Sequence, residues 1–152
     1  MGNCAIADSS LCCESGKEQR GNAFAFGYNA KAYNYCTFAF GSGEAAGEYA
    51  VAMGGGNAYG TQSMGVCGSS GSYGLASFSQ GGGSVANGSH SMATGYSVSA
   101  VGTCSHAEGG STAAFGDSSH AEGTGTETHG YSSHAEGRMT YASGYSSHAE
   151  GH

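Results

Sequence analysis

A histidine and a glutamate two residues apart are the most conspicuous chemically active side chains in this sequence. The motif Ser-His-Ala-Glu-Gly occurs four times at a constant 14-residue spacing, beginning at Ser105, Ser119, Ser133 and Ser147. Imidazole and carboxylate groups can exchange protons, form ion pairs or ligate metal ions. The resulting set, called here the His/Glu ladder, comprises His106, Glu108, His120, Glu122, His134, Glu136, His148 and Glu150.

The spacing of these residues argues against catalysis. Ser105 and His106 are neighbours in an extended segment, so their side chains point to opposite faces and cannot form a Ser-His-Glu triad. The deaminase signature that begins His-x-Glu needs a Pro-Cys pair, and the chain contains no proline. A helical His-Glu-x-x-His zinc motif and a phosphate-binding glycine loop are both absent from the sequence. We therefore expect neither an enzymatic activity nor a cofactor.

Two hypotheses remain for the ladder. In the preferred one, each imidazole pairs with a glutamate of its own or of a neighbouring subunit and relieves repulsion between stacked carboxylates. In the alternative, imidazole and carboxylate groups on one face bind a metal ion. Both types of group titrate between about pH 4 and 7, so we expect the stability of the assembly to change over that range.

The cysteines form a second reactive group, without the C-x-x-C spacing of a zinc ribbon or a thioredoxin-like site. Three of them lie in a non-repetitive segment, residues 1–20, which we expect to be an arm or lid. In an oxidising environment these thiols are predicted to crosslink to the other cysteines or to a neighbouring subunit. The alternative is a flexible tail with free thiols. The crosslink candidates are Cys4, Cys12, Cys13, Cys36, Cys67 and Cys104.

A regular repeat must position the ladder. Glycine recurs at every seventh position from Gly74 to Gly151, and small residues alternate between the glycines, as in Ser105 and Ala107. Alternation with period two is typical of a β-strand, and a glycine permits a sharp corner. Two short strands and two corners would make one 13- or 14-residue coil. The sequence thus predicts an all-β fold, a parallel β-roll or β-solenoid of nine to ten coils, over residues 21–152.

Composition supports a very narrow interior. The 152 residues include 30 Gly and no Trp, and Leu, Ile, Val and Phe together total 14. This composition alone favours a disordered linker, but a linker does not keep a 14-residue phase. We expect an interior of Ser, Ala and Thr alone. The net charge is −7 and the four basic residues are scattered, so we expect nucleic acid and anionic membrane surfaces to be poor partners. The sequence also lacks an apolar run of about 18 residues or more, the length that suggests a membrane-spanning helix.

The pattern S-x-A-x-G-x-x-T-x-A-x-G, seen in residues 133–144, resembles the head repeats of trimeric autotransporter adhesins, the YadA-like heads. The SHAEG repeats at 105–151 are also similar to those of bacterial surface proteins and phage fibre proteins. The resemblance covers roughly residues 21–151. It implies a left-handed parallel β-roll and a trimer.

The outward face of the first strand in each coil changes character along the chain. Its first half is apolar apart from Gln80 and Thr94, and its last four coils carry ionisable residues. A large exposed apolar patch usually marks an interface. We expect a subunit interface there, the alternative being that the N-terminal segment covers it. The residues are Phe24, Phe26, Phe38, Phe40, Val51, Met53, Met64, Val66, Phe78 and Met92.

Together these features predict a structural, self-assembling subunit of an extracellular or surface filament. The repeat continues to Gly151, so we expect uncapped coils to stack head to tail by β-augmentation, with intersubunit disulfides as reinforcement. The alternative function is a trimeric adhesin or phage-fibre head that binds a surface receptor. An ice-binding solenoid is disfavoured, because outward threonines are sparse.

We expect a homo-oligomer located at the cell or spore surface. Its export route is unknown, because no signal peptide is recognisable. The alternative location is a virion fibre.

Overall fold

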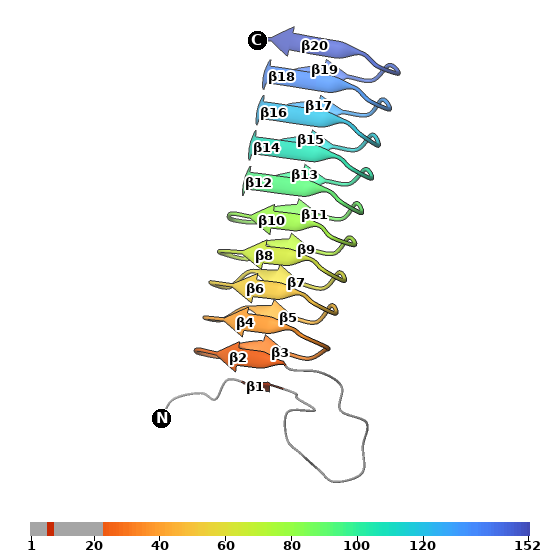
Figure 1. The fold of residues 1–152 in the computed structure, drawn as a ribbon. Helices are drawn as coiled ribbons and strands as arrows, with labels where there is room; N and C mark the ends of the chain where they lie inside the picture. Colours follow the sequence, from red (N-terminus) through yellow and green to blue (C-terminus); the bar gives the residue numbers. More distant parts are fainter. Residues whose placement is uncertain (1–5, 8–22) are drawn as a thin grey trace.

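The computed structural model describes residues 6–7 and 23–152, and in this part of the chain the protein is a parallel β-solenoid built from two sheets of ten strands (Figure 1). The even sheet consists of β2 (Phe24–Phe26), β4 (Phe38–Phe40), β6 (Val51–Met53), β8 (Met64–Val66), β10 (Phe78–Gln80), β12 (Met92–Tyr96), β14 (His106–Gly110), β16 (His120–Thr124), β18 (His134–Arg138) and β20 (His148–Gly151). The odd sheet consists of β1 (Ile6–Ala7), β3 (Lys31–Ala32), β5 (Glu44–Ala45), β7 (Asn57–Ala58), β9 (Gly71–Ser72), β11 (Val85–Ala86), β13 (Ser99–Ala100), β15 (Ala113–Ala114), β17 (Glu127–Thr128) and β19 (Tyr141–Ala142). The predicted all-β solenoid is confirmed.

Each strand pairs in parallel with the equivalent strand of the coils before and after it. Phe38 pairs with Val51, a 13-residue step, whereas His106 pairs with His120, a 14-residue step. These steps confirm the predicted coil length. The first strand of the odd sheet comes from the predicted N-terminal arm, because Ile6 pairs with Lys31. Residues 1–5 and 8–22 of that arm lie outside the described residues.

No helix that could cross a membrane occurs among residues 6–7 and 23–152.

Small side chains fill the space between the two sheets. Ala107, Ala114 and Ala121 are completely buried. Most buried hydroxyl groups are tolerated because they find an acceptor; the Oγ of Ser119, for example, donates to the carbonyl oxygen of Gly116 at 2.6 Å. The hydroxyl groups of Ser63, Ser105 and Thr126 have no partner. An interior this narrow explains why the chain uses almost no Leu or Ile.

Contrary to the prediction, the interior is not made only of Ser, Ala and Thr. Gly65 takes the inward position of β8, and one larger side chain is also buried. Val98 is 1% exposed and is the largest fully buried side chain among the described residues. It lies one coil before Thr112, in the same register position. Valine and threonine have nearly the same shape, so the position accepts either one without widening the coil.

The prediction that glycines serve the corners is only partly correct. A Cβ at Gly116 would collide with the next coil, since the carbonyl oxygen of Gly130 lies directly against that position. In the following turn the left-handed backbone conformation belongs to Ser118, with φ of 55°. This uncommon conformation is held by a hydrogen bond to the preceding coil, in which the Ser118 N–H donates to the Thr103 carbonyl at 2.8 Å. Glycine here permits the close approach of coils.

Candidate functional site

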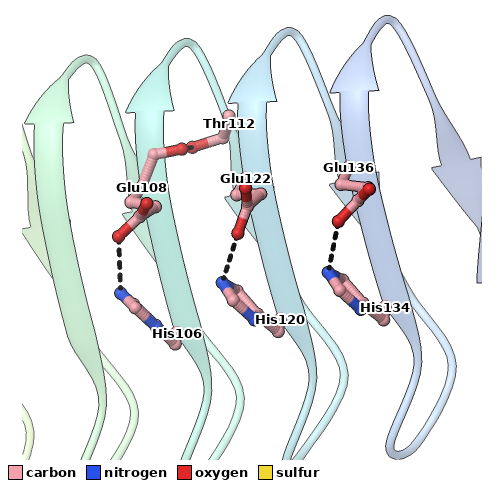
Figure 2. A network of polar contacts seen from close by, with 7 residues as sticks. All are labelled: His106, Glu108, Thr112, His120, Glu122, His134 and Glu136. Carbon is pink, nitrogen blue, oxygen red and sulfur yellow. Dashed lines mark hydrogen bonds and ion pairs between the residues drawn. The ribbon is translucent and has the colours of Figure 1, made fainter. Parts of the chain in front are cut away.

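The parallel register brings the ladder into two straight columns on the outer face of the even sheet. His106 pairs with His120, His120 with His134, and His134 with His148, and the glutamates two residues later follow the same register. Figure 2 shows three of these imidazoles stacked in one orientation, each with a nitrogen directed at the carboxylate of its own strand. The ladder therefore arises from the 14-residue period, because every coil places the same two residues at the same position.

The imidazole rings stack on one another along the column. Ring centroids are 4.6 Å apart between His106 and His120, 4.8 Å between His120 and His134, and 4.9 Å between His134 and His148. The first two pairs are nearly parallel, with interplanar angles of 10° and 0°, and the last is tilted by 33°. These separations match the strand spacing of a sheet, so the backbone sets the distance between rings.

Within each coil the imidazole and the carboxylate lie close together but outside ordinary hydrogen-bonding distance. The separation from Nε2 to Oε2 is 3.4 Å for His106, 3.5 Å for His120 and 3.7 Å for His134. Protein N–H···O hydrogen bonds are about 2.7–3.2 Å long. The Nε2 atoms of these three histidines are shielded from solvent and have no hydrogen-bond partner. Each pair becomes an ion pair only when the imidazole is protonated.

A second histidine–glutamate pair lies on the odd sheet, and reasoning from the sequence did not single it out as a site. His129 and Glu127 are hydrogen-bonded at 3.1 Å, and the imidazole of His129 stacks between Phe115 and Tyr141. The sequence feature that could have revealed this pair is the same two-residue spacing in the reverse order, Glu-Thr-His. This pair is the internal comparison for the ladder, since its nitrogen has the partner that the ladder nitrogens lack.

The environment of His120 favours the neutral imidazole. Burial lowers the pKa of His120 below its ordinary value of 6.5, and repulsion from His106 and His134 lowers it further. The carboxylates of Glu122 and Glu108 act in the opposite direction but do not reverse the shift. In the folded protein, His120 therefore takes up its proton at a lower pH than in the unfolded chain.

We expect the metal-free protein to lose stability as the pH falls from 7.5 to 5. Below pH 6.5 the unfolded chain protonates His120 while the folded chain resists, so proton binding favours unfolding. Urea unfolding in the presence of a chelator, measured at several pH values, tests this expectation. His120→Gln should make the dependence shallower over the same interval. A stability that stays flat or rises on acidification would contradict the assignment.

The predicted interface residues form an apolar face on the even sheet from β2 to β12, and both of its outward columns are apolar as far as β8. The Phe24 and Phe38 rings stack at 5.2 Å, and those of Phe26 and Phe40 at 5.5 Å. Phe24 and Phe26 remain 51% and 58% exposed. Val51, Met53, Met64 and Val66 continue both columns. On β10 and β12 only the first column stays apolar, with Phe78 and Met92, because Gln80 and Thr94 stand in the second. The described part of a single chain thus leaves these side chains accessible to a partner.

The described cysteines do not meet within one chain. Cys36, Cys67 and Cys104 are free and exposed. Cys36 precedes β4 and Cys104 precedes β14, five coils or about 24 Å further along, far beyond the roughly 7 Å between Cα atoms that a disulfide spans. Cys67 follows β8, in the turn at the other end of the strands. Cys4, Cys12 and Cys13 lie outside the described residues, so their predicted crosslinks stay predictions.

Comparison with known proteins identifies the repeat. Residues 73–97 match the family described as the YadA head domain repeat, in two copies. The matched segment includes β10, β11 and β12 and thus crosses both sheets. The match agrees with the resemblance that the motif pattern indicated, and it covers these 25 residues of the chain. No curated protein sequence matches the chain.

These observations define the class: a YadA-head-like β-solenoid repeat protein. Repeats of this family are typically non-enzymatic modules of surface-exposed adhesins. The solenoid is consistent with a structural module of an adhesin or fibre.

Proposed function

We propose that this chain is the rod-shaped head module of a trimeric adhesin or fibre displayed at a cell surface. The observation that carries the proposal is the apolar face of the even sheet, which runs through six consecutive coils. The YadA head repeat at residues 73–97 supports it, because the family implies trimeric assembly.

The apolar face has the dimensions of a lateral contact between parallel rods. From β2 to β12 it extends about 24 Å along the axis, given the spacing of about 4.8 Å between paired strands. Its phenylalanines are stacked by the register and already ordered, so little side-chain entropy is lost on association. Burial of this face against two other copies would remove a patch that a monomer would expose to water.

The mass of the purified protein in solution tests the proposal. We expect a particle of about 45 kDa, three times the 15.0 kDa chain. Phe26→Ser combined with Phe40→Ser should yield monomers that retain the β-sheet circular dichroism spectrum, because both side chains lie outside the coil. Tyr141→Ser is the matched control, since Tyr141 is 57% exposed on the odd sheet. A monomeric native protein, or an oligomer unchanged by the phenylalanine substitutions, would contradict a trimer held by this face.

A head-to-tail filament is the competing proposal. The same samples, examined by electron microscopy, distinguish the two arrangements: discrete rods of fixed length support the head module, and long fibres support axial stacking. Among the described cysteines no disulfide is formed, so covalent reinforcement rests on pairing between chains or with the first three cysteines.

A further inference from the structure

We propose that His120, Glu122 and His134 form a binding site for a divalent transition-metal cation such as Zn²⁺, Ni²⁺ or Co²⁺. One donor atom from each of these residues lies within 4.8 Å of the other two. β16 supplies the first two residues and β18 the third, so the site would bridge two successive coils. Imidazole nitrogen combined with carboxylate oxygen is a donor set that suits these cations.

The first argument for the site is the state of the imidazole nitrogens. The Nε2 atoms of His120 and His134 are shielded from solvent and accept or donate no hydrogen bond. A buried polar atom without a partner costs free energy, and native proteins seldom leave one so. A metal ion would bind the lone pairs of both nitrogens, whereas the neighbouring carboxylates stand too far away to satisfy them.

The second argument is the distance between imidazole and carboxylate. The His120 Nε2 and the Glu122 Oε2 are 3.5 Å apart, longer than a hydrogen bond. Two ligands at about 2.0–2.1 Å from a tetrahedral zinc ion lie about 3.3 Å from each other. The pair is therefore spaced as two ligands of one ion. The rings of His120 and His134 are parallel, with an interplanar angle of 0°. To complete the set, His134 would have to tilt its ring toward β16, and a tilt of 33° is present one coil further on, between His134 and His148.

The third argument comes from the charge and exposure of the ladder. Among the described residues, no Lys or Arg forms an ion pair with the four ladder glutamates, whose neighbours at ion-pair distance are the ladder histidines. The side chains of His120, Glu122 and His134 are each between about a third and two-fifths exposed, which admits water as the remaining ligands. By contrast, His129 and Glu127 on the odd sheet satisfy each other with a 3.1 Å hydrogen bond. The same residue types thus have a partner on one sheet and lack one on the other.

Calorimetric titration of the full-length, untagged protein with Zn²⁺ tests the site. The protein should be chelator-treated and its thiols blocked with N-ethylmaleimide, so that cysteines do not contribute. We expect about one ion per chain. His120→Gln and His134→Gln should each weaken binding by about tenfold or more, since loss of even an outer partner of a metal ligand commonly costs that much. His129→Gln is the matched control and should leave the affinity unchanged.

Two further measurements keep the test decisive if a histidine variant folds poorly. Glu122→Gln changes a part-exposed side chain and should also weaken binding while the circular dichroism spectrum is preserved. Co²⁺ should show visible absorption bands of a nitrogen- and oxygen-ligated ion with the native protein but not with Glu122→Gln. Binding that none of the three ladder variants reduces, or that His129→Gln reduces equally, would overturn the proposal. Neither result bears on the oligomeric state, which is measured separately.

Discussion

Gly109→Ala is expected to destabilise the solenoid by about 3 kcal/mol or more, whereas Gly110→Ala should change the free energy of unfolding by less than about 0.5 kcal/mol. Gly109 has φ of 110°, a conformation that residues with a Cβ rarely adopt. An alanine Cβ there would also press on the Gly123 carbonyl oxygen of the next coil and lie 3.0 Å from its carbon. Backbone strain and a clash between coils add together at this one position.

The adjacent glycine provides the control. Gly110 lies on the same strand, and a Cβ added to it meets nothing within 4 Å. Urea unfolding of both variants, followed by circular dichroism, compares the two substitutions directly. Equal stabilities would show that the coils can separate at Gly109 without cost, and the explanation of the glycine period by close packing would then be wrong.

Ala114→Leu is the second substitution with a large expected effect, a loss of about 3 kcal/mol, at the upper end of what overpacked cores show. Ala114 is completely buried between the two sheets. Leucine adds three carbons to an interior in which Val98 is the largest fully buried side chain described. The two sheets would have to move apart, which the short corners between them resist.

Ala113→Leu is the matched control, because Ala113 precedes Ala114 on β15 and is only partly buried on the outer face. We expect it to change stability by less than about 0.5 kcal/mol. Thermal unfolding of the two variants measures the difference. If Ala114→Leu were as stable as Ala113→Leu, the interior would be wider than the structure shows.

Much of the architecture could be predicted because the repeat encodes it locally. The alternation of small residues distinguishes inward from outward positions, and the 14-residue period aligns equivalent residues from coil to coil. His106 and His120 therefore had to stand in one column once the coils were paired. The same reasoning placed Phe24 beside Phe38, whose rings are 5.2 Å apart.

Other features could not be predicted from the period. The left-handed conformation at Ser118 and at Met139 depends on how the chain turns between sheets, and neither residue type signals it. The pairing of Ile6 with Lys31 joins a non-repetitive segment to the solenoid, so no periodicity could reveal it.

The residue pattern was enough to predict a β-solenoid with small residues inside, a largely apolar outer face over the first six coils and a His/Glu ladder over the last four. Side-chain direction alternates along a strand, so a list of residues suffices to assign faces. The pattern does not reveal that the ladder nitrogens of His120 and His134 lack hydrogen-bond partners while His129 has one; this follows from the three-dimensional packing. That difference depends on atomic separations of a few tenths of an ångström, which are set by how two sheets and their turns pack together.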